Sequence, residues 1–127
     1  MVNQRKKQQL QSNLRGNQGE QLAQKYLQSN GYKIIETNWH IKWAEIDIVG
    51  LDGDTLAIVE VKTRYSHDRG SPEEAITPHK LHSLERSALL YKQVHEGLPD
   101  AMRIDFIGID YAVSNPPRIN LIKNISV

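Results

Sequence analysis

The sequence lacks cysteine, has no long hydrophobic run and carries almost no excess charge, and each absence excludes a class of protein. Without cysteine there is no disulfide framework and no thiol chemistry, which fits a reducing cytoplasm. No run of about 18 apolar residues is present, so no membrane-spanning helix is predicted. Residues 1–11 are polar, unlike a secretory signal. We therefore expect a cytoplasmic protein that has no membrane partner.

The formal net charge is only +1, whereas a domain that holds nucleic acid by charge alone is far more basic. Any nucleic-acid binding must then depend on locally clustered cations. A length of 127 residues predicts one domain. The polar, basic start, with Arg5, Lys6 and Lys7, predicts a flexible tail over residues 1–12, followed by a single domain over residues 13–127.

Hydrophobic periodicity predicts the element order αβββαββ, and thus an α/β fold with a mixed central sheet flanked by helices. The expected helices cover 13–30 and 78–97, and the expected strands cover 32–39, 45–49, 55–64, 102–111 and 118–125, the last at a sheet edge. Ser12 or Asn13 is the expected cap of the first helix and Gly31 its stop. Ala23 and Leu27 share the inward stripe of this helix with Glu20, and an acid is unusual there.

The triplet Glu60-Val61-Lys62 ends an otherwise apolar strand. Strand alternation places Glu60 and Lys62 on one face, about 7 Å apart, where they continue the row of Leu56 and Ile58. The pattern alone leaves two readings open: a chemical site, or a contact between neighbouring charges at a sheet end, which contributes little energy.

Asp47 decides between these readings through strand register. If Asp52-Gly53 closes a two-residue hairpin, Asp47 faces Ile58, and any loop with an even number of residues leaves Asp47 on the Glu60 side of the sheet. Two carboxylates that point at one place repel unless a cation lies between them. We predict Asp47 and Glu60 as ligands of Mg²⁺ or Mn²⁺, with Lys62 stabilising charge on a phosphate, in metal-assisted phosphodiester hydrolysis.

The spacing from Asp47 to Glu60-Val61-Lys62 resembles that of the PD-(D/E)xK nuclease superfamily, whose nearest architectures are archaeal-type Holliday-junction resolvases and tRNA-endonuclease-like folds. The resemblance implies a restriction-endonuclease-like core. It also implies an acid from the first helix at the site, which Glu20 matches. A departure is Ile46, which stands where the superfamily name has Pro.

The chain is also similar to the YraN-like family of small bacterial proteins. The family usually has glycine at the position of Ala44. The resemblance to the nuclease superfamily implies an endonuclease that acts on nucleic acid, with DNA favoured over RNA, and a symmetric junction substrate would suit a homodimer. It is carried by the segments Gly16-Asn17-Gln18-Gly19-Glu20, Ala44-Glu45-Ile46-Asp47-Ile48-Val49, Val59-Glu60-Val61-Lys62-Thr63-Arg64, Gly70-Ser71-Pro72-Glu73-Glu74-Ala75 with Lys80, and Arg103-Ile104-Asp105-Phe106.

Several residues keep two interpretations. Arg64 and Lys80 are candidates for phosphate contacts or ordinary solvated charges. Trp39 and Trp43 either stack on exposed bases or pack in a core or dimer contact. Asp105 is either a structural partner for a nearby arginine or an accessory of the site. His79 and His82 lie three residues apart on one helix without a third ligand, so no zinc site is predicted.

Two other functions compete with the nuclease hypothesis. One is a non-catalytic nucleic-acid-binding module that retains the nuclease fold, and the other is an adaptor that binds a protein and no divalent metal.

Overall fold

The computed structural model describes residues 3–126, apart from the side chains of residues 9–17. Its elements follow the order predicted from the sequence, a 3-10 turn over Pro72–Ala75 precedes the second helix, and the α/β class is confirmed. Within the described residues, none of the helices combines the length and hydrophobicity that a membrane span requires. The elements are α1 (Gln4–Ser29), β1 (Lys33–Ile41), β2 (Ala44–Asp52), β3 (Thr55–Arg64), η1 (Pro72–Ala75), α2 (Pro78–Val94), β4 (Met102–Asp110) and β5 (Arg118–Ile122).

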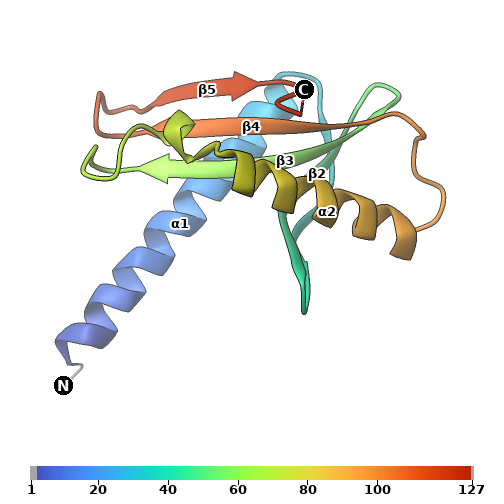
Figure 1. Cartoon of the computed structure of the whole chain (residues 1–127). Helices are drawn as coiled ribbons and strands as arrows, with labels where there is room; N and C mark the ends of the chain where they lie inside the picture. The colour runs from blue at the N-terminus through green and yellow to red at the C-terminus, as the bar shows by residue number, and fades with distance from the viewer. Residues whose placement is uncertain (1–2, 127) are drawn as a thin grey trace.

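The five strands form one sheet in the order β1-β2-β3-β4-β5 (Figure 1). Three neighbouring pairs are antiparallel, and β3 pairs with β4 in parallel across the α2 connection. The predicted mixed sheet is therefore confirmed, and β5 lies at an edge as expected.

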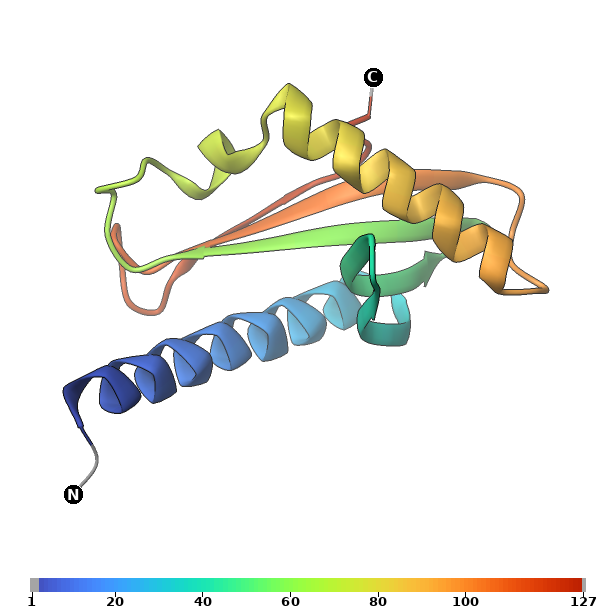
Figure 2. The same ribbon diagram turned by 60° about the horizontal axis from the view of Figure 1, so that its bottom comes forward.

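The two helices cover opposite faces of the sheet, α1 below and α2 above in Figure 2. Each face has its own hydrophobic core. On the α2 side, Leu56 and Ile58 of β3 pack with Leu84, Ala88 and Tyr91. The α1 side buries a second set, which includes Ala23, Leu27, Ala57, Val59, Ile107 and Ile109. Strand β3 is apolar on both faces because it lies between these two layers, as predicted.

Helix α1 begins at Gln4 rather than near Asn13, so residues 4–12, expected to be a flexible tail, are helical. The cap is Asn3, whose Oδ1 accepts a hydrogen bond from the Lys6 N–H at 2.8 Å, and not Ser12 or Asn13. The first half of the helix projects past the sheet in Figure 1. Its glutamines and lysines are strong helix formers, so the segment extends the helix without needing a core to pack on.

The β2–β3 hairpin has a two-residue loop, but the loop is Gly53-Asp54 and not Asp52-Gly53. Asp52 pairs with Thr55, and Val49 pairs with Ile58, so Asp47 does not face Ile58 as expected. Gly53 has a φ of +60°, the backbone conformation that two-residue hairpins require and that glycine adopts without strain. The loop nevertheless has an even number of residues, and this keeps Asp47 on the side of Glu60.

Strand β2 is separated from β3 over residues 44–47 and pairs with it only from Ile48 onward, where Ile48 faces Val59. Strand alternation would place Ile46 and Ile48 on one face, but Ile46 belongs to the α2-side core and Ile48 to the α1-side core. Asn38, which faces this stretch from β1, has a φ of +52°. The local kink turns the β1–β2 hairpin out of the sheet plane, and the separation from β3 leaves space beside Asp47.

Candidate functional site

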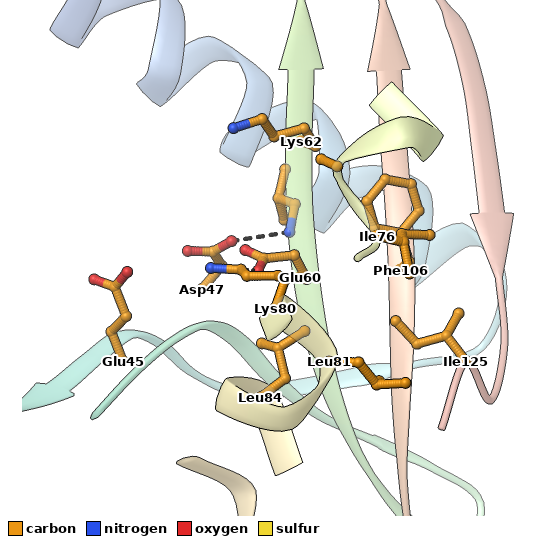
Figure 3. A pocket seen from close by; sticks show the side chains of 12 residues that line it. Glu45, Asp47, Glu60, Lys62, Ile76, Lys80, Leu81, Leu84, Phe106 and Ile125 are labelled. Atoms are coloured by element: carbon orange, nitrogen blue, oxygen red, sulfur yellow. Dashed lines mark hydrogen bonds and ion pairs between the residues drawn. The ribbon is translucent and has the colours of Figure 1, made fainter. Parts of the chain in front are cut away.

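A cavity of about 310 Å³ lies on the α2 face, at the point where β2 separates from β3. One side is polar and carries three acids and two lysines, whereas the other side is apolar (Figure 3). The polar set is Glu45, Asp47, Glu60, Lys62 and Lys80, and the apolar set is Val61, Ala75, Ile76, Leu81, Leu84, Phe106 and Ile125. Such a mixed cavity can exclude water on one side while it presents charges on the other.

Asp47 is fixed by the backbone of the neighbouring strand. Its Oδ2 accepts a hydrogen bond from the Val61 N–H at 2.9 Å, drawn as a dashed line in Figure 3. This N–H lies beyond the last paired residues of β2 and β3, so the carboxylate replaces a ladder bond. The side chain is thereby oriented toward Glu60.

Glu60 meets Asp47 inside the cavity, and the proximity changes its titration. Burial, a side-chain hydrogen bond with Asp47 and the charge of Asp47 raise the pKa of Glu60 to about 8, against the opposing effect of Lys80. At neutral pH the pair therefore tends to share a proton, because two adjacent carboxylates in a partly dry cavity cannot both ionise without a further positive charge.

Lys80 supplies part of that charge. Its Nζ lies 2.9 Å from Glu60 Oε2, and the Lys80 side chain is 40% exposed while that of Glu60 is 14% exposed. Burial acts to lower the pKa of Lys80, but the ion pair with Glu60 and the charges of Asp47 and Glu45 outweigh it, so the pKa is raised. Lys80 was predicted as a phosphate contact, and the structure places it beside the acids.

Lys62 lines the same cavity, but its ammonium points away from Asp47 and Glu60 in Figure 3. Within the described part of the chain, no carboxylate lies within ion-pair distance of Lys62. We expected Asp47, Glu60 and Lys62 to point toward one another, but only the two acids do so. The Lys62 side chain is long and flexible, so strand alternation fixes its face and not the position of its charge.

Glu20 lies on α1 and is not among the residues that line the cavity, but it is near enough to Asp47 for their charges to interact. Burial and the charge of Asp47 raise the pKa of Glu20, whereas a hydrogen bond with Asn38 lowers it. The approach is possible because residue 19 is glycine: a Cβ there would lie 2.2 Å from Thr63 Oγ1 on β3. Gly19 therefore lets the helix backbone contact the strand and bring Glu20 close to Asp47.

Residues 70–75 form the turn that precedes α2, and Ala75 at its end lines the apolar side of the cavity. Gly70 has a φ of +92°, and Glu74 Oε2 accepts a hydrogen bond from the Ser71 N–H at 2.9 Å, which closes the turn before η1. Pro72 packs on Gly108, where a Cβ would lie 2.9 Å from the proline ring. The turn places Ala75 and the following Ile76 in the apolar lining and then leads into the helix that carries Lys80.

Arg64 was expected on the rim of the site, but it lies outside the set of cavity-lining residues. Its Nε is buried and has no hydrogen-bond partner among the described residues. Among those residues, no group of three or more histidine, aspartate or glutamate side chains has the spacing of a metal centre.

Two further alternatives are resolved by the structure. Trp39 is a core residue, with its ring in a T-shaped contact 5.1 Å from that of Tyr91, whereas Trp43 is 69% exposed at the β1–β2 turn. Asp105 lies on the α1 side and is a structural partner: its carboxylate accepts hydrogen bonds from Arg103 Nε at 2.8 Å and from the Tyr32 hydroxyl at 2.6 Å.

Three contributions to the site were not predicted: the Val61 N–H, the Asn38 side chain and the pairing of Lys80 with Glu60. The first two depend on where β2 leaves β3, and the third depends on the crossover through α2. Asparagine does tolerate positive φ, so Asn38 carried a weak indication of a kink.

Comparisons with known proteins give a consistent assignment. Residues 19–109 match the sequence profile described as Uncharacterised protein family UPF0102. A UPF0102 protein of Dehalococcoides mccartyi is 46% identical over 110 residues, 86% of this chain and 89% of the relative. UPF0102 proteins of Arthrobacter sp. and Chlorobium chlorochromatii are 40% and 42% identical, over 88% and 83% of this chain and 95% and 81% of the relatives.

Proposed function

This protein belongs to the UPF0102 family, and we propose that it is a metal-dependent endonuclease that hydrolyses phosphodiester bonds of nucleic acid, with DNA as the expected substrate. The observation that carries the proposal is the meeting of Asp47 and Glu60 in one cavity, where burial and mutual repulsion raise the pKa of Glu60 to about 8. Such a perturbed pair of acids in a cavity is typical of a functional site.

The donor set fits a hard divalent cation. Asp47 uses Oδ2 for the Val61 N–H, so its other oxygen and the Glu60 carboxylate are the groups that would hold Mg²⁺ or Mn²⁺. A metal held there supplies Lewis-acid stabilisation of phosphate charge and lowers the pKa of its bound water. The pKa shift of Glu60 is the physical reason for the fit, because a cation between the acids would remove their repulsion.

The two lysines of the cavity have different roles in the proposed reaction. Lys80 pairs with Glu60, so its charge offsets the buried acids. Lys62 lies on the same cavity without an acidic partner among the described residues, and its charge is available to a substrate phosphate. We therefore assign to Lys62 the stabilisation of negative charge that develops during hydrolysis. Glu20 acts on the site through Asp47, as a positioning acid.

The resemblance to the PD-(D/E)xK superfamily supports the same proposal. Its implied restriction-endonuclease-like core is compatible with a mixed sheet between two helices that carries Asp47, Glu60 and Lys62 on one face. The assignment of reaction and substrate still depends on the site and not on the fold.

The proposal is tested with end-labelled single-stranded, duplex and four-way-junction DNA, and with RNA, in Mg²⁺, in Mn²⁺ and in EDTA. We expect Asp47→Asn and Glu60→Gln to lower metal-dependent cleavage by at least about 100-fold, because each removes a ligand charge. Lys62→Met should also lower cleavage while metal binding persists. Asp54→Asn is the matched control, since Asp54 is an exposed acid in the β2–β3 turn. Equal cleavage by wild type and Asp47→Asn would mean a contaminant and end the proposal.

A second candidate function is a nucleic-acid-binding module without catalysis. The observation in its favour is the orientation of the Lys62 ammonium away from both acids. Such a module would bind oligonucleotides with an affinity that falls steeply with salt, and would cleave none of them in any metal.

A further inference from the structure

A second, more open hollow of about 690 Å³ lies between the β1–β2 turn and α2, and we call it the hairpin groove. Its β side comprises residues 40–45, and its α2 side comprises residues 79–87. The hairpin that forms one wall extends out of the sheet plane beside α2 (Figure 1). Neither wall consists mainly of large apolar side chains, which distinguishes the groove from an unfilled hydrophobic contact.

The groove concentrates positive charge in a chain whose net charge is only +1. Lys42, Lys80 and Arg86 line it, together with two histidines, and Glu45 is the only acid among the described lining residues. Lys80 is already paired with Glu60, so Lys42 and Arg86 face one acid, Glu45, and this surface keeps an excess of positive charge. Locally clustered cations of this kind are the arrangement that the low net charge requires for phosphate binding.

Trp43 provides a second, independent feature. Its ring is 69% exposed, although a large aromatic side chain usually gains by burial. The turn that carries it is held in place, because Arg86 Nη2 donates a hydrogen bond to the Trp43 carbonyl at 3.2 Å. The Lys42 ammonium lies 4.9 Å from the centre of the ring. An exposed ring on an anchored turn, with a cation beside it, matches a platform on which a base stacks while its phosphate meets the cation.

The hairpin groove adjoins the cavity that contains Asp47 and Glu60, which we call the carboxylate cavity. Glu45, Lys80 and Leu84 line both. A strand that followed the cations of the groove would therefore arrive at Asp47 and Glu60 without crossing another element.

We propose that the hairpin groove binds an unpaired segment of nucleic acid, with a base stacked on Trp43 and phosphates on Lys42 and Arg86, and leads it to the carboxylate cavity. Bases of a closed duplex stack on one another and offer no free face to the ring, so the preferred substrate contains unpaired nucleotides. This inference rests on the proposed function, since it names the substrate class of that site.

The first test measures binding without cleavage, by fluorescence anisotropy of labelled oligo-dT and of a duplex of equal length in EDTA. We expect tighter binding of the single strand, and a loss of about tenfold for Trp43→Ala. Trp43→Phe should restore most of the affinity, because the smaller ring still stacks. Leu89→Ala is the matched control, since Leu89 is 59% exposed on α2 outside the groove. Equal affinity of wild type and Trp43→Ala overturns the inference.

The second test uses the salt dependence of the same binding. Lys42→Gln should reduce the slope of log K against log salt by about 0.7, the value for one phosphate contact on a single strand. Lys25→Gln should leave the slope unchanged, because Lys25 is exposed on α1, which covers the opposite face. If Trp43→Ala instead converts a dimer into a monomer, as measured by light scattering, with unchanged oligonucleotide affinity, the surface is a contact between copies and the inference fails.

The failures of the two proposals are distinguishable. If oligo-dT binding depends on Trp43 but no metal supports cleavage, the proposed role of the groove stands and the nuclease proposal fails. If Asp47→Asn abolishes metal-dependent cleavage while Trp43→Ala changes neither binding nor cleavage, the nuclease proposal stands and the proposed role of the groove fails.

Discussion

Asp105 on the α1 face is buried and Glu60 on the α2 face is half-buried, and these acids of neighbouring parallel strands have different surroundings. Both oxygens of Asp105 accept hydrogen bonds: Arg103 Nε and the Asn124 N–H donate to Oδ1, and Tyr32 donates to Oδ2. Arg103 also pairs with Asp52. Glu60 faces another carboxylate and has one partly exposed lysine as its cationic partner.

The difference distinguishes charged side chains that stabilise the fold from charged side chains that destabilise it. A buried acid whose oxygens all accept hydrogen bonds from the protein stabilises the fold, and removing it leaves a buried cation without its partner. A buried acid whose neighbour raises its pKa costs folding free energy, so its presence needs another explanation, such as a bound cation. The contrast predicts opposite responses to the same chemical change.

The largest expected effect is on stability. Asp105→Asn should lower the free energy of unfolding by about 3 kcal/mol, because it leaves the half-buried Arg103 with one carboxylate fewer. Glu60→Gln, the same change on the other face, should leave stability unchanged or raise it, because it removes repulsion from Asp47. Urea unfolding of both variants measures the contrast. Equal losses for the two would show that Glu60 is an ordinary structural acid.

The next effect is the pH dependence of stability. Glu60 has a native pKa of about 8 against an ordinary 4.5, so it binds its proton more tightly when folded. Its contribution to stability is present in full below about 4.5 and is lost as the pH rises through about 8. The slope reaches at most about 1.4 kcal/mol per pH unit. Glu60→Gln should flatten the curve over that window.

Asp52 affects the pH dependence of stability with the opposite sign and serves as the internal control. Hydrogen bonds from Arg103 and Lys123 lower the pKa of Asp52, so its contribution is present above its ordinary value of 3.8 and is lost as the pH falls through its native value. Asp52→Asn should therefore alter the acid limb of the stability curve and leave the neutral window as in wild type. A neutral-pH slope that persists in Glu60→Gln would contradict the assignment.

A divalent cation should convert the unfavourable acid pair into a stabilising one. Mg²⁺ or Mn²⁺ at a hundred times its Kd should raise the free energy of unfolding by about 2.7 kcal/mol, because only the native state brings the two acids together. Thermal unfolding at several metal concentrations measures the shift. Asp47→Asn should abolish it and Asp54→Asn should retain it. A shift that survives in Asp47→Asn would place the ion elsewhere.

Much of the fold and part of the site could be predicted from the sequence, because the relevant features are local. The period of two along β3 placed Glu60 and Lys62 on one face, and Thr77-Pro78 defined the start of α2. An even hairpin loop kept Asp47 on their side although the turn is one residue later than predicted. A site built from strand parity tolerates this shift.

The rest depends on contacts between distant segments. Which lysine meets Glu60 is decided by the passage of α2 over β3, and the position of a flexible ammonium does not follow from the face of its strand. The separation of β2 from β3, which opens the cavity, lies opposite the kink at Asn38, and the bond from the Val61 N–H to Asp47 spans it. Neither appears in the hydrophobic pattern. The close packing at Gly19 is likewise invisible until Thr63 is placed beside it.

Gly19→Ala gives the smallest effect and links the two faces. Its Cβ would lie 2.2 Å from Thr63 Oγ1, so α1 must shift, at a cost of about 1–2 kcal/mol in unfolding free energy. The shift moves Glu20 relative to Asp47, so cleavage should fall too. Thr63→Ala removes the opposing hydroxyl, and the double variant should recover part of both losses, which a double-mutant cycle measures. Strictly additive losses would show that the two residues are not coupled and that the loss does not arise from this contact.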